Sequence, residues 1–77
     1  MADKSLTAQK LKMWNDKLAQ LEVRYEEIMV RRSEAMAMGD LRENAAFQMA
    51  DEDASAMGVQ IDEVKKIISK LERGEES

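Results

Sequence analysis

The feature that most constrains this chain is a pair of apolar stripes with the alternating three- and four-residue spacing of a helical heptad repeat. One charged residue interrupts the first stripe, which consists of Leu11, Trp14, Leu18, Leu21, Tyr25, Ile28, Arg32 and Ala35. The second stripe is apolar throughout and consists of Phe47, Ala50, Ala54, Met57, Ile61, Val64, Ile68 and Leu71. Such spacing places one seam along one face of a helix. The sequence therefore predicts an all-α fold of two long helices.

The segment between the stripes is short, and a short connection makes neighbouring helices antiparallel. We predict one helix over about residues 5–38, a tip at residues 39–43, and a second helix that begins at Leu41 or Glu43 and ends near residue 73. Gly39 is well placed to end the first helix in a left-handed conformation. The fold expected is an antiparallel two-helix coiled-coil hairpin, with each helix roughly 45–50 Å long at about 1.5 Å per residue.

The antiparallel arrangement also predicts which residues meet. Seam residues whose numbers add to 82 face each other, so that Leu21 meets Ile61. Arg31 and Asp53 flank the seam at one level and could form an ion pair, although exposed pairs of this kind contribute only about 0–1 kcal/mol. A hairpin with one seam encloses no pocket for a small substrate.

Composition limits the possible chemistry. The chain has 77 residues, enough for one small domain, and it contains neither cysteine nor histidine. Disulfides, the common zinc sites and histidine-dependent nucleophiles are therefore excluded. Twelve basic and 16 acidic residues give a net charge of −4, which argues against a general nucleic-acid binder. No apolar run approaches membrane-spanning length, so we expect a cytoplasmic protein.

The tip carries two carboxylates, Asp40 and Glu43, just after Gly39. One interpretation is an ordinary helix start, in which Asp40 caps the second helix and Glu43 completes a capping box. Negative charge at that position also interacts favourably with the helix dipole. The other interpretation is that both carboxylates are available for chemistry. On this spacing alone, capping is the stronger interpretation.

A longer stretch, A-M-A-M-G-D-L-R-E-N-A-A-F-Q-M-A over residues 35–50, resembles the tip of the Gre transcript-cleavage factors (the GreA/GreB family) of bacterial RNA polymerase. Their signature runs approximately A-R-x-x-G-D-L-[KRS]-E-N-A-E-Y-x-x-A. The matching positions are Ala35, Gly39, Asp40, Leu41, Arg42, Glu43, Asn44, Ala45 and Ala50, with Phe47 in the aromatic place. Met36 replaces the usual arginine, and Ala46 replaces the usual glutamate. The resemblance is specific over residues 35–50, and helix one matches by pattern only.

The resemblance implies a partner and a mechanism. In Gre factors the hairpin enters the secondary channel of RNA polymerase, where the tip carboxylates help to hold the second catalytic Mg²⁺ and orient a water. The backtracked RNA 3′ end is then hydrolysed by the polymerase itself, so the factor is not a free-standing enzyme. Carried onto this chain, those carboxylates are Asp40 and Glu43. Two carboxylates hold Mg²⁺ only weakly, so we expect an ion that is shared with the polymerase.

Basic residues near the tip are candidates for contact with RNA or polymerase. They are Arg42, between the carboxylates, and Arg31 and Arg32, two turns below; a solvated or salt-bridged face explains them equally well. Asn44 belongs to the same candidate contact group, although it is expected chiefly to fix the turn.

Gre factors usually carry a second, globular domain, and we expect none after residue 77 here. Three functions remain open: a cleavage factor, a channel binder that inhibits or modulates polymerase, and a general coiled-coil interaction module. Several apolar residues fall outside the seam and suggest a partner or a weak homodimer: Met13, Val23, Val30, Met49, Val59 and Ile67.

Overall fold

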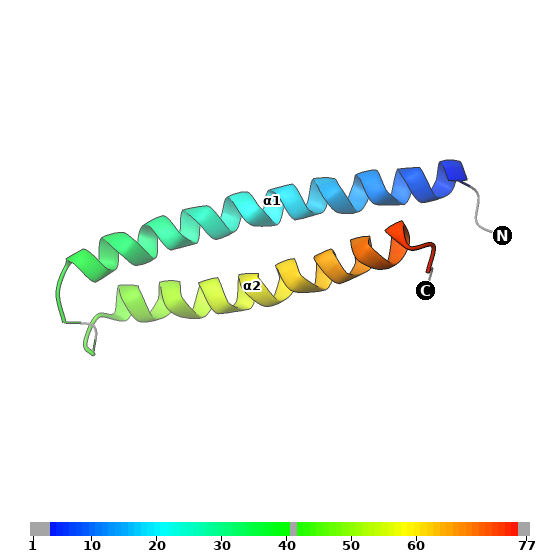
Figure 1. Ribbon diagram of the computed structural model, residues 1–77. Helices are drawn as coiled ribbons and strands as arrows, with labels where there is room; N and C mark the ends of the chain where they lie inside the picture. Colours follow the sequence, from blue (N-terminus) through cyan, green and yellow to red (C-terminus); the bar gives the residue numbers. More distant parts are fainter. Residues whose placement is uncertain (1–3, 41, 76–77) are drawn as a thin grey trace.

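The computed structural model describes residues 4–40 and 42–75, and it consists of two helices joined by one turn. Helix α1 is Lys4–Ala37 and helix α2 is Ala45–Glu72. They run antiparallel along their whole length, so that the first turn of α1 and the last turn of α2 lie at the same end of the hairpin (Figure 1). The described residues contain no strand. The predicted all-α hairpin is confirmed, although α2 begins later than Leu41 or Glu43.

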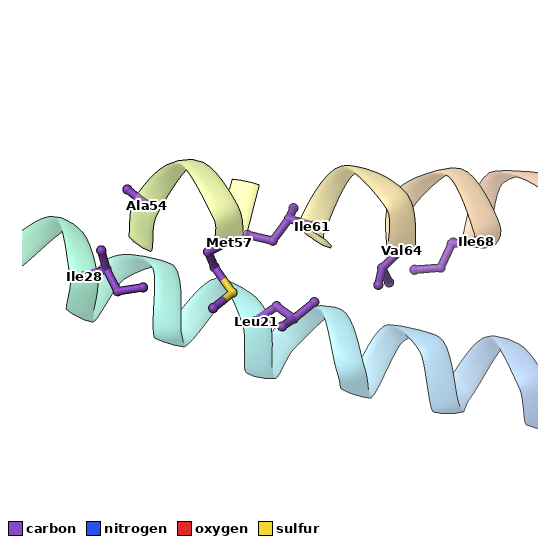
Figure 2. Packing of buried hydrophobic residues seen from close by; sticks show 7 residues of the cluster. All are labelled: Leu21, Ile28, Ala54, Met57, Ile61, Val64 and Ile68. Carbon is purple, nitrogen blue, oxygen red and sulfur yellow. The ribbon is translucent and has the colours of Figure 1, made fainter. Parts of the chain in front are cut away.

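The core follows the two predicted stripes. Among the described residues, all ten that are buried belong to them: Leu21, Ile28 and Ala35 from α1, and Ala50, Ala54, Met57, Ile61, Val64, Ile68 and Leu71 from α2. The larger seam residues of α1, such as Trp14 and Tyr25, are half-buried and pack against this cluster. Figure 2 shows Ile28 facing Ala54, a pair whose numbers add to 82. Because no side chain in residues 4–40 and 42–75 is completely enclosed, the hairpin has a seam and not a globular interior.

A glycine motif closes the C-terminal end of α2. Gly74 has a positive φ of 76°, and its N–H donates to the Leu71 carbonyl at 3.1 Å. The Glu75 N–H donates to the Lys70 carbonyl at 2.8 Å. This pair of bonds is the Schellman motif, which satisfies carbonyls that the end of a helix leaves without partners. The backbone is therefore held in place as far as Glu75.

The hairpin is a thin rod that measures 57 × 17 × 12 Å. Its accessible surface is 5985 Å², whereas a compact globular protein of this mass would expose about 4,800 Å². The apolar residues predicted to lie off the seam contribute to this surface, since Met13, Val23, Val30, Met49 and Val59 are exposed. No helix within the described ranges is long and apolar enough to cross a membrane.

Candidate functional site

The candidate site lies where the chain passes from α1 to α2. After Ala37 the helix is closed by two bonds, from the Met38 N–H to the Ala35 carbonyl at 3.1 Å and from the Gly39 N–H to the Met36 carbonyl at 3.5 Å. Gly39 then takes a φ of +128°, which L-residues with a side chain rarely adopt. The predicted role of Gly39 as the residue that ends the first helix is confirmed.

Asn44, and not Asp40, caps helix α2. The Asn44 Oδ1 accepts the Phe47 N–H at 3.0 Å, and the residue has the extended backbone of an N-cap, with φ −93° and ψ 90°. The predicted capping box of Asp40 and Glu43 is therefore wrong. A capping box needs its glutamate three residues after the N-cap, whereas Glu43 directly precedes the N-cap residue Asn44. Leu41, the other predicted start of the helix, lies outside the described residues.

The Asn44 side chain also ties the two helices together. Its Nδ2 donates to the Ala35 carbonyl at 2.6 Å, while its Oδ1 serves the start of α2. One half-buried amide thus satisfies an acceptor at the end of one helix and a donor at the start of the next. This confirms the expectation that Asn44 fixes the turn. The suggestion that it also contacts RNA or polymerase stays a prediction.

The two tip carboxylates are left exposed. The Asp40 Oδ1 accepts the Arg42 N–H at 3.0 Å, a local turn of the kind that aspartate commonly makes. Within residues 4–40 and 42–75, Glu43 has neither a hydrogen-bond nor an ion-pair partner. Since Asn44 supplies the cap, the start of α2 does not account for either carboxylate. Both are free to present oxygen atoms to something outside the chain.

The donor set at the tip fits a shared Mg²⁺ better than a resident one. Carboxylate oxygens are the hard ligands that Mg²⁺ prefers, and the ion is often held by one or two of them together with water and substrate oxygens. Among the described residues, no group of three or more acidic, histidine or cysteine side chains could hold a metal ion. An ion held by Asp40 and Glu43 would therefore need further ligands from a partner.

The Arg32 side chain forms contacts within the hairpin, and in this it differs from the other two arginines among the candidate contact residues, Arg31 and Arg42. Its Nε donates to Asp51 Oδ1 at 2.9 Å, and its guanidinium lies 4.7 Å from the centre of the Phe47 ring. Its side chain is 28% exposed. A charged residue on the seam has to leave it sideways, and here it passes over the aromatic ring toward α2. Arg32 and Asp51 therefore form an ion pair between the helices, and the predicted pair of Arg31 with Asp53 is not formed.

Arg31 and Arg42 keep exposed side chains. Arg31 lies beside Glu34 and Asp53 in a shallow groove between the helices. Arg42 is fixed through its backbone, because its N–H donates to Asp40 and its carbonyl accepts from Gln48 Nε2 at 3.0 Å. These two residues are the basic groups that remain available close to the carboxylates.

Two residues that shape the tip, Gln48 and Asp51, were not predicted from the sequence. Gln48 braces the Arg42 carbonyl from the first turn of α2, and Asp51 holds Arg32. The role of Gln48 could have been predicted, because an N-cap at Asn44 places Gln48 in the first turn of α2, where it faces the turn between the helices. Nothing in the sequence distinguished Asp51 in this way, since by position alone Arg31 and Asp53 were an equally good ion pair.

Fold and site together define an antiparallel helical hairpin that presents two exposed carboxylates on a braced turn. The protein-family model described as "Transcription elongation factor, N-terminal", which covers GreA and GreB, matches residues 4–72. The chain belongs to this family of N-terminal Gre-factor domains. Membership indicates a role in transcription elongation, with RNA polymerase as the partner in general terms. Neither the curated proteins nor the solved structures gave a significant match.

Proposed function

We propose that this protein binds bacterial RNA polymerase through the secondary channel and stimulates cleavage of backtracked transcript. The tip would reach the catalytic centre, where Asp40 and Glu43 would help to hold the Mg²⁺ that the polymerase also binds. On this proposal the protein is not itself an enzyme, because the hydrolytic reaction belongs to the polymerase. Its place of action is the cytoplasm, where bacterial transcription occurs.

The observation that carries the proposal is the release of both carboxylates from helix capping. Asn44 caps α2, so Asp40 and Glu43 are not needed to begin the helix. They lie at the end of a rod that is 57 Å long and at most 17 Å wide. A shape of this kind suits a protein that reaches into a channel, and it offers no enclosed site of its own.

The residues around the carboxylates suit the proposed reaction. When bound, Mg²⁺ stabilises the charge that develops on the phosphate and helps to activate the attacking water. Asp40 is held by its bond to the Arg42 N–H, so one oxygen is oriented while the other can face a ligand. The exposed guanidinium groups of Arg42 and Arg31 are suited to bind RNA phosphates. Arg32 is less suited, because Phe47 and Asp51 already occupy it.

The direct test uses stalled, backtracked polymerase complexes and measures release of short 3′ RNA fragments. The double variant Asp40→Asn, Glu43→Gln should bind polymerase with an affinity within about threefold of the wild type, because exposed polar substitutions change little. Its cleavage rate should fall by at least about a hundredfold, the usual cost of misplacing a catalytic group. Raised Mg²⁺ should restore part of the rate.

The matched control is Glu52→Gln, Asp53→Asn. It also removes two negative charges, but from an exposed part of α2 about two turns from its start. This variant should cleave like the wild type. Two results would refute the proposal. If the wild-type protein binds polymerase and slows nucleotide addition without cleavage, it is a channel blocker. If it does not bind polymerase, the remaining interpretation is a general coiled-coil interaction module.

A further inference from the structure

The second feature of interest lies at the open end of the hairpin, which is the end away from the tip where the first turns of α1 meet the last turns of α2 (Figure 1). A groove of about 300 Å³ lies between the helices there. We call it the open-end groove, and it is lined by Lys10, Trp14, Lys66, Ile67, Lys70, Leu71 and Glu75. Some 27 residues of α1 separate Lys10 from the turn, which places the groove roughly 40 Å from the tip.

The floor of the open-end groove is apolar. Leu71 is a buried seam residue, and Trp14 is half-buried against the core. Ile67 lies off the seam and is half-buried, and part of its side chain lines the groove. At 300 Å³ the groove is at the lower limit of ligand pockets. It is large enough for one or two apolar side chains of a partner.

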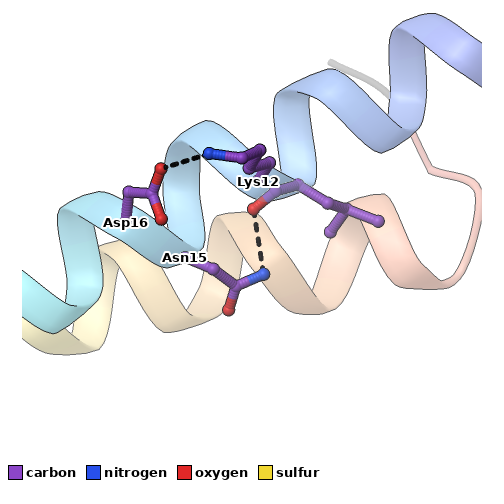
Figure 3. Close-up of polar contacts among 4 residues, drawn as sticks. Lys12, Asn15 and Asp16 are labelled. Atoms are coloured by element: carbon purple, nitrogen blue, oxygen red, sulfur yellow. Dashed lines mark hydrogen bonds and ion pairs between the residues drawn. The ribbon is translucent and has the colours of Figure 1, made fainter.

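The rim of the open-end groove is basic although the chain as a whole has a net charge of −4. Three lysines line it, and its single glutamate, Glu75, is already paired with Arg73 at 2.7 Å. Lys66 and Lys70 form no ion pair with any residue in the described ranges. Lys12 differs from them, because its ammonium group binds Asp16 at 3.1 Å (Figure 3). The groove therefore combines an apolar floor with the positive charge of Lys66 and Lys70, which no residue of the described ranges neutralises through an ion pair.

We propose that the open-end groove binds an acidic peptide segment of a partner protein, with a bulky apolar side chain of that segment inserted beside Trp14 and Ile67. Charge complementarity supports this occupant, because carboxylates flanking the inserted side chain would meet Lys66 and Lys70. RNA fits less well. Only part of Trp14 is available for stacking, and an acidic chain with a few lysines at one end gains little from phosphate contacts. The inference does not depend on transcript cleavage.

Trp14 provides a direct measurement, since it is the only tryptophan of the chain. The probe is a synthetic peptide with a leucine–phenylalanine pair flanked on both sides by glutamates, added to the full chain at 50 mM salt. We expect a saturable change in Trp14 emission. Lys66→Glu, Lys70→Glu should weaken binding by at least about tenfold, as expected when two favourable charge pairs become repulsive. Ile67→Ser should also weaken it while the thermal melt still shows a folded hairpin.

The matched control is Lys12→Glu, Lys65→Glu, which makes the same change of charge outside the groove and should alter the affinity by less than about threefold. Equal loss in both double variants would refute the proposal, because the attraction would then be that of the whole chain. An Ile67→Ser variant with unchanged affinity would also refute it. Tighter binding of oligouridylate RNA than of the peptide would make the groove a nucleic-acid site. If Trp14 emission changes with protein concentration in the absence of peptide, the groove is occupied by a second copy of the chain.

Discussion

Replacing Asn44 tests the structure of the tip most directly. Asn44→Ala removes the acceptor that caps α2, which costs about 0.5–2 kcal/mol. It also removes the donor to the Ala35 carbonyl at 2.6 Å, a bond whose loss costs about 0.5–1.5 kcal/mol. We therefore expect the free energy of unfolding to fall by about 1–3.5 kcal/mol. For a domain of this size, 2 kcal/mol lowers the Tm by about 8–16 °C.

Asp40→Ala provides the comparison, since it removes the residue that the sequence favoured as the cap. In the structure the Asp40 side chain makes one local bond to the Arg42 N–H and is exposed. Its replacement should cost less than about 0.5 kcal/mol, the range typical of surface substitutions. Circular dichroism melts of the two variants beside the wild type decide the matter. If Asp40→Ala lowers the Tm as much as Asn44→Ala does, α2 begins at Asp40 and our account of the tip is wrong.

Two further predictions concern the rest of the hairpin. Gly58 lies within α2, and a Cβ added there would meet no atom within 4 Å, so Gly58→Ala should stabilise the protein by about 0.5–1 kcal/mol. A lower Tm in the same melts would mean that the space beside Gly58 is filled in solution. The exposed apolar residues also predict weak self-association, which Val23→Ser, Val30→Ser should reduce in sedimentation equilibrium at high protein concentration. A monomer at every concentration for the wild-type chain would contradict this prediction.

The architecture could be predicted from the sequence because the heptad stripes determine it. Every buried residue in the part of the chain that the structure describes lies on one of the two stripes, and the glycine at the turn has the positive φ that ends α1. Burial of apolar side chains is a strong, non-directional effect, so the spacing of Leu21 and Ile28, or of Ile61 and Val64, is enough to define the facing surfaces. The charged interruption, Arg32, leaves the seam and covers Phe47, a contact that was not predicted.

The details of the tip could not be predicted because two residues of equal capping propensity compete there. Aspartate and asparagine are about equally good N-caps, and Asp40 and Asn44 are four residues apart. The contact that distinguishes them is the bond from Asn44 to the Ala35 carbonyl, which exists only when the hairpin has closed. The ion pair of Arg32 with Asp51, in place of the predicted pair of Arg31 with Asp53, is decided in the same way, by side-chain direction across the helices. Local sequence contains neither piece of information.

The length of the hairpin has a geometric consequence for any protein that acts through its tip. The rod is 57 Å long, so a rotation of only about 1° at the open end moves the tip by about 1 Å, a misplacement that can cost about a hundredfold in rate. The position of Asp40 and Glu43 would therefore be set by whatever fixes the angle of the rod at its opposite end. A substitution there could change the rate of a reaction roughly 50 Å away without altering a single contact at the tip.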